Sequence, residues 1–207
     1  MKKTVIFDLD GTLVDSRHNI AEAINFAREA KGLPPMSHSD VFSSLNALTF
    51  ESAKSFYGQD ASASDHAVFE RRYEEICLID LKLYDQIADL LAALADRGVK
   101  LAVATNATSR FARVMLDYAG VSRYFALMLG ADNVARPKPA PDMLLLALEQ
   151  TNAVASEAVF LGDSPKDMKA AASAAIDGVF AAWGYGNAAK ADRVAQTPMD
   201  LLDIIGA

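Results

Sequence analysis

The stretch VIFDLDGTLV, residues 5–14, ends an apolar run in two carboxylates. The run Val5–Phe7 is typical of a buried strand, whereas Asp8 and Asp10 follow it at once. Two carboxylates in a poorly solvated place are costly unless a cation or a proton neutralises them. Because Gly11 begins a turn, both side chains can face the space above the sheet. The pair therefore indicates either a shared functional site at this strand end, or carboxylates that only bond backbone donors of their own loop.

Short apolar, β-branched runs alternate with amphipathic or Ala-rich segments along most of the chain. This alternation predicts an α/β fold, a doubly wound, Rossmann-like parallel sheet with helices on both faces. The strands are expected at Thr4–Phe7, Lys100–Ala104, Phe125–Leu129, Ala158–Leu161 and Val179–Ala182. The helices are expected at about 84–97, 107–119, 140–151, 165–175 and 198–205.

The segment 16–81 has helical periodicity and no convincing strand. Four helices are expected in it, at Asn19–Lys31, Ser39–Leu45, Phe50–Tyr57 and Ser64–Ile79. The chain is therefore expected to form an α/β core domain, residues 1–15 and 82–207, with an all-helical cap domain, residues 16–81, inserted after the first strand. Open α/β sheets bind ligands at the carboxyl ends of their strands, where such an insertion could act as a lid.

Composition and charge limit the classes of partner. The 207 residues are 52% hydrophobic and carry a formal net charge of −7, which disfavours binding to nucleic acid or to an anionic membrane surface. The single Cys77 cannot form an internal disulfide, and the start MKKTVIFDLD lacks the apolar stretch of a signal peptide. No apolar run approaches the length that spans a bilayer. These features predict a soluble, cytoplasmic protein.

Polar residues also follow two later strands. Thr105 and Asn106 come after the strand at 100–104, where a hydroxyl and backbone N–H groups could hold an anion. Taken alone, Thr105 is more often the N-cap of the next helix. Lys138 lies between two prolines in ARPKPAPD, residues 135–142. The prolines restrict where its ammonium can go, but a lysine in such a loop is also commonly solvated.

The segment GDSPKD, residues 162–167, follows the strand at 158–161 and brings a carboxylate from a second strand end. Hard divalent cations such as Mg2+ take oxygen ligands, so Asp8, Asp163 and a backbone carbonyl near Asp10 could hold one. Asp167 is expected near this metal or its water. It also completes a capping box at the start of a helix, and the two roles are compatible.

Together FDLDGTLVDS, ATN, RPKPAPD and GDSPKD resemble the motifs of the haloacid dehalogenase-like (HAD) hydrolase superfamily, in particular its phosphoglycolate phosphatase-like branch with a helical cap. The resemblance covers about residues 1–16 and 85–185, and VFAAWGYG, residues 179–186, is similar to the loop after the family's fifth strand. It implies a phosphatase that hydrolyses small phosphate monoesters with Mg2+ through an aspartyl-phosphate.

The resemblance also implies a role for each motif residue. Asp8 is the nucleophile, and Asp10 is the general acid and base, with a pKa above that of Asp8. Thr105 and the amide of Asn106 bind phosphoryl oxygens, and Lys138 neutralises the charge that spreads over them. The implied metal ligands are Asp8, Asp10 and Asp163, with Asp167 beside the metal or its water.

Other activities on this scaffold are distinguished by single residues. A dehalogenase of the superfamily would lack Asp10. A phosphonatase-type enzyme would need a Schiff-base lysine in the cap, and Lys31, Lys54 and Lys82 lie in no evident motif. A sugar-phosphate mutase would need an acid or base on the cap side. His18 is a candidate for that role, although an exposed position at a helix start explains it as well, so the mutase stays an alternative to hydrolysis.

Two non-enzymatic alternatives remain. Receiver-like signalling modules also combine a phosphorylated aspartate, Mg2+, threonine and lysine at strand ends, but they lack a base two residues after the acceptor and lack a large helical insertion. A binding protein that has lost catalysis is the second alternative, and no missing residue suggests it. A P-loop is excluded because the chain has no G-x-x-x-x-G-K-[ST] stretch.

The expected substrate-facing loop of the cap departs from the phosphoglycolate branch. That loop tends to carry glycine, whereas the segment 43–49 reads SSLNALT, and LYDQ, residues 83–86, stands where a Pro-Gly often follows the cap. The resemblance is therefore not taken to imply phosphoglycolate as the substrate. Ser44 and Asn46 are candidates for specificity contacts, or ordinary loop residues.

Overall fold

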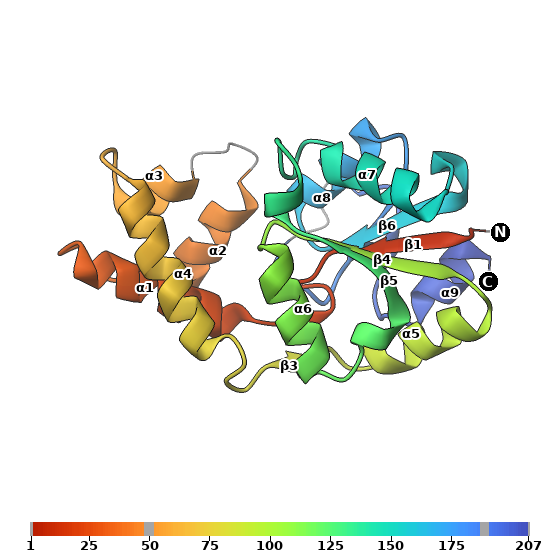
Figure 1. Cartoon of the computed structure of the whole chain (residues 1–207), viewed down its shortest axis with the longest axis horizontal. Coiled ribbons are helices and arrows are strands. Elements are labelled where there is room, and N and C mark those ends of the chain that lie inside the picture. The colour runs from red at the N-terminus through yellow and green to blue at the C-terminus, as the bar shows by residue number, and fades with distance from the viewer. Residues whose placement is uncertain (1, 48–51, 187–190, 207) are drawn as a thin grey trace. The chain divides into compact units, whose positions relative to one another are not determined.

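The computed structural model describes residues 2–47, 52–186 and 191–206 (Figure 1). The chain divides into two compact units. An α/β unit comprises Met1–Asp15 and Lys82–Ala207, and a helical unit comprises Ser16–Leu81. Because the chain leaves the α/β unit after its first strand and returns to it later, the first strand pairs with segments far along the sequence.

A six-stranded sheet in the order β5-β4-β1-β6-β7-β8 forms the centre of the α/β unit as far as the structure describes it. All of its strand pairs are parallel. The strands are β1 (Thr4–Phe7), β4 (Lys100–Ala104), β5 (Phe125–Leu129), β6 (Ala158–Gly162), β7 (Asp177–Ala181) and β8 (Val194–Ala195). The prediction of a doubly wound parallel sheet is therefore confirmed, and every parallel strand ends at the same edge as β1.

The two faces of the sheet are covered by different helices (Figure 1). On one face lie α7 (Asp142–Thr151) and α8 (Pro165–Ser173), and on the other lie α5 (Ile87–Asp96), α6 (Ser109–Tyr118) and α9 (Asp200–Ile205). The chain runs outward from β1 to β4 and β5, then returns to β6 on the opposite side of β1. Because such crossovers are right-handed, the helices before and after the return lie on opposite faces. The strand order reverses at β1, and open α/β sheets bind their ligands at the carboxyl end of the strands at such a point.

One hydrophobic core lies between the sheet and the helices α7 and α8. Its side chains are almost entirely aliphatic, and the alanines of α8 let that helix approach the sheet closely. The buried members are Ile6, Ala102, Ala104, Leu129, Met143, Leu144, Ala147, Leu148, Ala158, Phe160, Ala170, Ala171, Ala174 and Ile176. This packing fixes β1 and β6, whose ends carry the polar motifs.

Three short strands were not predicted. Besides β8, the two-residue strands β2 (Val14–Asp15) and β3 (Lys82–Leu83) pair antiparallel where the chain leaves and re-enters the α/β unit. Strands of two residues are too short to show an alternation of apolar and polar residues. They hold the two crossing segments side by side.

The helical unit contains α1 (Arg17–Ala30), α2 (His38–Asn46), α3 (Ser52–Tyr57) and α4 (Ala63–Ile76), of which α1 and α4 pack against each other. Asn25 of α1 bridges the backbone of Met36, donating to its carbonyl at 3.0 Å and accepting from its N–H at 2.8 Å. The predicted end of the last helix at Ile79 is wrong, because the helix ends at Ile76 and a turn follows. Residues 50 and 51 of the helix predicted at 50–57 lie outside the described residues.

Within the described part of the chain, no helix combines the length and the apolar character needed to cross a membrane.

Two adjacent leucines of α7 should separate core packing from surface effects. Leu144 is fully buried, whereas Leu145 is 48% exposed. We expect Leu144→Ala to lower the free energy of unfolding by roughly 2–5 kcal/mol, because it removes transfer energy and leaves a cavity. Leu145→Ala should cost less than about 1 kcal/mol. Urea denaturation followed by circular dichroism measures both, and equal losses would contradict the packing of α7 on the sheet.

Candidate active site

The turn after β1 presents Asp8 and Asp10 at the edge of the sheet. Asp8 is 7% exposed, and its N–H donates to the Leu161 carbonyl of β6 at 2.9 Å. The Leu9 carbonyl accepts from the three N–H groups of residues 12–14 at 2.9–3.3 Å, which closes the turn. Asp10 is half-buried and forms a backbone bridge with Val14. Asp8 is therefore a buried carboxylate on a rigid support.

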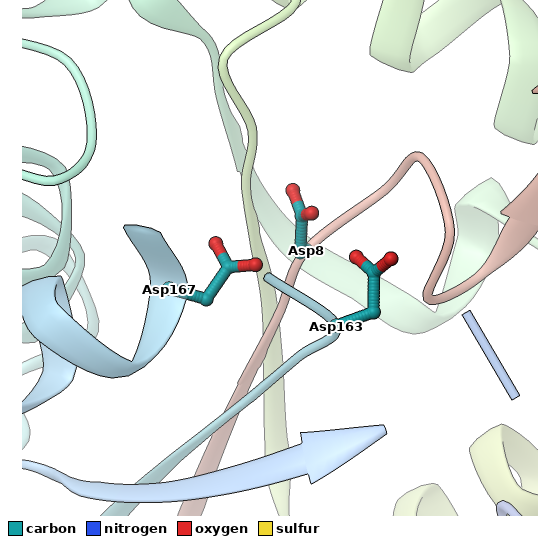
Figure 2. A group of neighbouring side chains, drawn as sticks. All are labelled: Asp8, Asp163 and Asp167. Carbon is teal, nitrogen blue, oxygen red and sulfur yellow. The ribbon is translucent and has the colours of Figure 1, made fainter. Parts of the chain in front are cut away.

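Three carboxylates from separate segments meet at this edge (Figure 2). Asp8 follows β1, Asp163 follows β6, and Asp167 lies in the first turn of α8. One oxygen of each lies within 4.8 Å of the others, and all three residues are buried. The carboxylate of Asp10 is not a member of this group. The sequence predicts that Asp10 contributes a backbone carbonyl to the metal rather than its carboxylate, and this stays a prediction.

Lys138 is the cation of the cluster. Only 2% of the residue is exposed, so the alternative of a solvated loop lysine is wrong. Its Nζ lies 2.6 Å from Asp8 Oδ1, 2.7 Å from Asp167 Oδ1 and 5.2 Å from the centroid of the Phe160 ring. Burial alone would lower the pKa of Lys138, but Asp167 and Asp8 outweigh it and raise this pKa above its usual value. Lys138 is therefore a permanent positive charge.

The two oxygens of Asp167 have separate partners. Oδ2 accepts from the N–H of Ser164 at 2.9 Å and from its hydroxyl at 2.6 Å, which forms the predicted capping box of α8. Oδ1 makes no aligned hydrogen bond within the described structure, although Lys138 Nζ lies close to it. Asp167 thus caps its helix with one oxygen and presents the other to the cluster, as its two compatible roles require.

Asp163 is held by segments that the sequence analysis did not assign to the site. Its Oδ2 accepts from the N–H of Tyr185 at 2.6 Å, and its Oδ1 lies 3.4 Å from the Thr12 hydroxyl, which donates to it. Trp183 donates from Nε1 to the Thr12 carbonyl at 3.0 Å. Two features of the sequence could have indicated these contacts: the threonine of DLDGT and the loop in VFAAWGYG. The loop is named above as a similar motif, without roles for its residues.

Glycines allow the backbone to approach Asp163. An ideal Cβ on Gly11 would lie 2.3 Å from Asp163 Oδ2, and one on Gly184 would lie 2.2 Å from Asp163 Cβ. Gly11 also has φ +84°, a conformation that other residues adopt with strain. Larger side chains at these positions would displace the carboxylate.

The cluster carries more negative than positive charge in a poorly solvated place. Burial raises the pKa of Asp8 well above its usual range, Lys138 opposes this, and Asp167 and Asp163 add to it. Burial and Asp167 raise the pKa of Asp163 to about 7, against the opposing Tyr185 amide. A further positive charge is therefore needed to keep both carboxylates ionised at neutral pH.

The residues fit a hard divalent cation. Buried carboxylate oxygens from three segments lie close together, and one of them, Asp167 Oδ1, has no aligned donor. Hard oxygen ligands of this kind suit Mg2+, which is usually held by one or two carboxylates, water and substrate phosphate.

Thr105 and Asn106 lie at the same sheet edge, after β4. Thr105 is buried, and its hydroxyl oxygen accepts from the Ala107 N–H at 3.1 Å. The N-cap alternative for Thr105 is wrong, because α6 begins at Ser109 with Thr108 as its N-cap. The Asn106 side chain bonds the backbone of Lys138 on the next loop.

The specificity candidates lie in the helical unit. Ser44 and Asn46 are half-buried residues of the last turn of α2. The expectation of a loop at 43–49 is therefore wrong up to residue 46, and residues 48 and 49 lie outside the described part. His18 is exposed near the start of α1, with its ring centroid 5.9 Å from that of His38.

Comparisons with known proteins agree with this geometry. The sequence model of a family described as haloacid dehalogenase-like hydrolase matches residues 5–181. A phosphoglycolate phosphatase from Escherichia coli is 30% identical, covering 98% of this chain and 92% of the relative. An N-acetylmuramic acid 6-phosphate phosphatase from Pseudomonas aeruginosa is also 30% identical, covering 98% and 94%. A crystal structure from Haemophilus somnus, described as a predicted phosphoglycolate phosphatase, superposes with a TM-score of 0.86 at 28% identity, covering 98% and 97%.

Mg2+ should stabilise the metal-free protein more at about pH 8 than at about pH 5. The folded-state pKa of Asp163, about 7, lies above its unfolded value of about 3.9. Between these values the folded protein holds a proton that the unfolded chain has lost, so its stability falls as the pH rises. A bound divalent cation offsets this loss. Thermal unfolding across this pH range measures the increase in Tm that Mg2+ causes, with NaCl at equal ionic strength as reference.

A matched pair of glycine variants controls this experiment. Gly11→Ala should lose the Mg2+-dependent gain because its Cβ would displace Asp163. Gly98 has a similar positive φ of +72° but open space around an added Cβ. Gly98→Ala should therefore have a lower Tm without Mg2+ but show the same increase in Tm when Mg2+ is added. A gain that is independent of pH, or that survives in Gly11→Ala, would contradict a metal site at Asp163.

Proposed function

The chain belongs to the haloacid dehalogenase-like hydrolase family, and we propose that it is a magnesium-dependent phosphatase of small phosphate monoesters that works through an aspartyl-phosphate on Asp8. The observation that carries the proposal is the buried group of Asp8, Asp163 and Asp167 around Lys138 at the carboxyl edge of the sheet. Its relatives include phosphatases of phosphoglycolate and of N-acetylmuramic acid 6-phosphate, which supports a phosphate ester as substrate.

The first half-reaction transfers the phosphoryl group to the protein. An Asp8 oxygen attacks phosphorus, a bond forms between them, and the bond from phosphorus to the alcohol oxygen breaks. Asp10 donates a proton to the departing alcohol. Lys138 keeps Asp8 in place by its contact at 2.6 Å, and its charge offsets the negative charge on the phosphoryl oxygens.

The second half-reaction returns the protein to its starting state. Asp10, now ionised, takes a proton from a water molecule as the water oxygen attacks phosphorus. The bond between phosphorus and Asp8 breaks, inorganic phosphate leaves, and the Asp8 carboxylate is regenerated. Asp10 therefore needs a protonated form in one step and an ionised form in the other, which is the reason to expect its pKa above that of Asp8 in the loaded enzyme.

Mg2+ would be held by Asp8, Asp163 and the backbone carbonyl of Asp10, with Asp167 close by. When bound, it supplies positive charge that neutralises the phosphoryl oxygens and the surrounding carboxylates. Thr105 and the backbone amide of Asn106 bind phosphoryl oxygens from the neighbouring strand end.

The helical unit, residues 16–81, would act as the cap of the core domain formed by residues 1–15 and 82–207. The motif residues of the core recognise only the phosphoryl group, so the rest of the substrate must be selected elsewhere. Ser44 and Asn46 are the proposed polar contacts of the cap. The protein would act in the cytoplasm on small esters, without a nucleic-acid or membrane partner.

Substitution of the two aspartates tests the proposed roles. Asp8→Asn should abolish turnover, because an amide cannot accept the phosphoryl group. Asp10→Asn should lower the kcat for alkyl phosphates by roughly 10²–10⁴, the usual contribution of general acid and base catalysis. Phosphate release with Mg2+ measures both, and circular dichroism checks the fold.

The same assay separates the alternatives. Asp177 is the first residue of β7, away from the carboxyl edge of the sheet, and pairs with Lys2, so Asp177→Asn should retain wild-type turnover. Steady multiple turnover by the wild type supports the hydrolase, whereas a persistent phospho-protein would support the receiver-like alternative. Conversion of one sugar phosphate into its isomer without phosphate release would support the mutase.

A panel of phosphate monoesters tests the cap. Ser44→Ala and Asn46→Ala should each change the kcat/KM of preferred esters by about 2- to 10-fold, the effect of one neutral hydrogen bond, and change poor esters less. Ser43, exposed on the same helix, gives the control Ser43→Ala, which should leave the ranking unchanged. A ranking that is flat in the wild type and in all variants would refute selection by the cap.

A further inference from the structure

Asn106 and Lys138 are joined by two hydrogen bonds between neighbouring loops of the α/β unit. Asn106 Oδ1 accepts from the Lys138 N–H at 3.0 Å, and Asn106 Nδ2 donates to the Lys138 carbonyl at 2.9 Å. Both ends of the side-chain amide are thus used on the backbone of one residue. The side chain of Asn106 points to Lys138, whereas its backbone N–H belongs to the turn after β4.

The loop that carries Lys138 has few backbone donors. The Arg136 side chain pairs with Asp142 across it, but both residues belong to this stretch of the chain and do not join it to the neighbouring strand end. Residues 134–141 form neither helix nor strand, and Pro137, Pro139 and Pro141 have no N–H to donate. Between residues 137 and 141 only Lys138 and Ala140 carry a backbone donor. The Ala140 N–H closes a turn on the Pro137 carbonyl at 3.0 Å. The Lys138 N–H is therefore the donor that can tie this segment to the rest of the sheet edge, and it goes to Asn106.

The position of the Lys138 backbone determines where its charge lies. Its Nζ reaches Asp8 Oδ1 and Asp167 Oδ1 over the face of the Phe160 ring. Phe160 lies in β6, Asp167 lies in α8 and Asp8 directly follows β1. These elements are packed into the core, whereas Lys138 itself comes from an irregular loop. A displaced loop would move the ammonium away from partners that cannot follow it, and small misplacements of a catalytic group are costly.

We propose that the side chain of Asn106 is a positioning residue that fixes the backbone of Lys138, and thereby sets the ammonium against Asp8 for phosphoryl transfer. The inference rests on the proposed phosphatase function and deepens it. In this proposal Asn106 has two roles. Its backbone amide binds the phosphoryl group, whereas its side chain acts through Lys138 and contacts no substrate. The rival is a side chain that binds substrate directly, which its solvent exposure would permit.

The two roles predict different kinetics. If Asn106 acts through Lys138, Asn106→Ala should lower kcat by about 10- to 100-fold and change KM by less than about threefold, because alignment in the transition state is lost. Inorganic phosphate, used as a competitive inhibitor, should bind with little change. A direct substrate contact would instead raise KM and the inhibition constant of phosphate together.

A double-mutant cycle with Lys138→Ala provides the decisive measurement. Once Lys138 is removed, Asn106→Ala should lower kcat by less than about twofold further, because the two residues act as one unit. The matched control is Asn25→Ala. Asn25 makes the same pair of hydrogen bonds to the backbone of Met36 in the helical unit, so its effect should add to that of Lys138→Ala.

Hydrogen exchange gives a readout that does not need activity. In Asn106→Ala the amide of Lys138 should lose protection by about tenfold or more, while Asn25→Ala should leave it unchanged. This measurement also serves if Lys138→Ala fails to fold, since a lysine buried between carboxylates is costly to remove. Unchanged exchange at Lys138 would overturn the inference.

The outcomes separate this inference from the proposed function. A wild-type protein that hydrolyses no phosphate ester with Mg2+ would overturn the proposed function, and the inference with it. An active wild type in which Asn106→Ala and Lys138→Ala are additive, or in which only KM changes, would overturn the inference alone. Non-additive losses in kcat together with faster exchange at Lys138 would support it.

Discussion

A buried ammonium lies between two buried carboxylates at the carboxyl edge of the sheet. Lys138 Nζ contacts Asp8 and Asp167, and Asp163 adds a third carboxylate nearby. Removing one member of such a buried pair typically costs about 3–5 kcal/mol, because the remaining charge is left uncompensated. The group is nevertheless short of positive charge. Burial, together with this surplus of negative charge, raises the pKa values of Asp8 and Asp163, and the same surplus suits the site to a divalent cation.

The rest of the α/β unit can be understood as support for this group. Parallel strands bring Asp8 and Asp163 to one edge, and the capping box of α8 orients Asp167. Glycines at 11 and 184 let backbone lie against Asp163 where a Cβ would clash. Lys138 comes from an irregular loop, and its two backbone hydrogen bonds to Asn106 join this loop to the neighbouring strand end. Rigid elements carry the carboxylates, and the lysine is tied to them through a neighbouring loop.

Much of the fold was predictable because its elements are long enough to show a period. The strands at 4–7, 100–104 and 125–129 have the expected bounds, and each predicted helix of the α/β unit has a counterpart that is shorter by one or more residues at one or both ends. The strands β2, β3 and β8 were missed because two residues define no alternation. The loop expected at 43–49 is instead helical as far as Asn46, because the helix that begins at His38 runs through these residues.

The α/β class and the acidic and basic motifs at strand ends were predictable from the amino-acid sequence, as was the resemblance of these motifs to one family. That the motifs meet also followed, because a parallel sheet places the carboxyl ends of its strands at one edge. The sequence could not determine whether Thr105 caps a helix, whether Lys138 is solvated, or how Asp167 divides its two oxygens. Those outcomes depend on contacts between residues far apart in the chain, which burial and packing alone decide. Tertiary structure made Lys138 a buried counter-ion, and it joined Asn106 to the backbone of a residue 32 positions away.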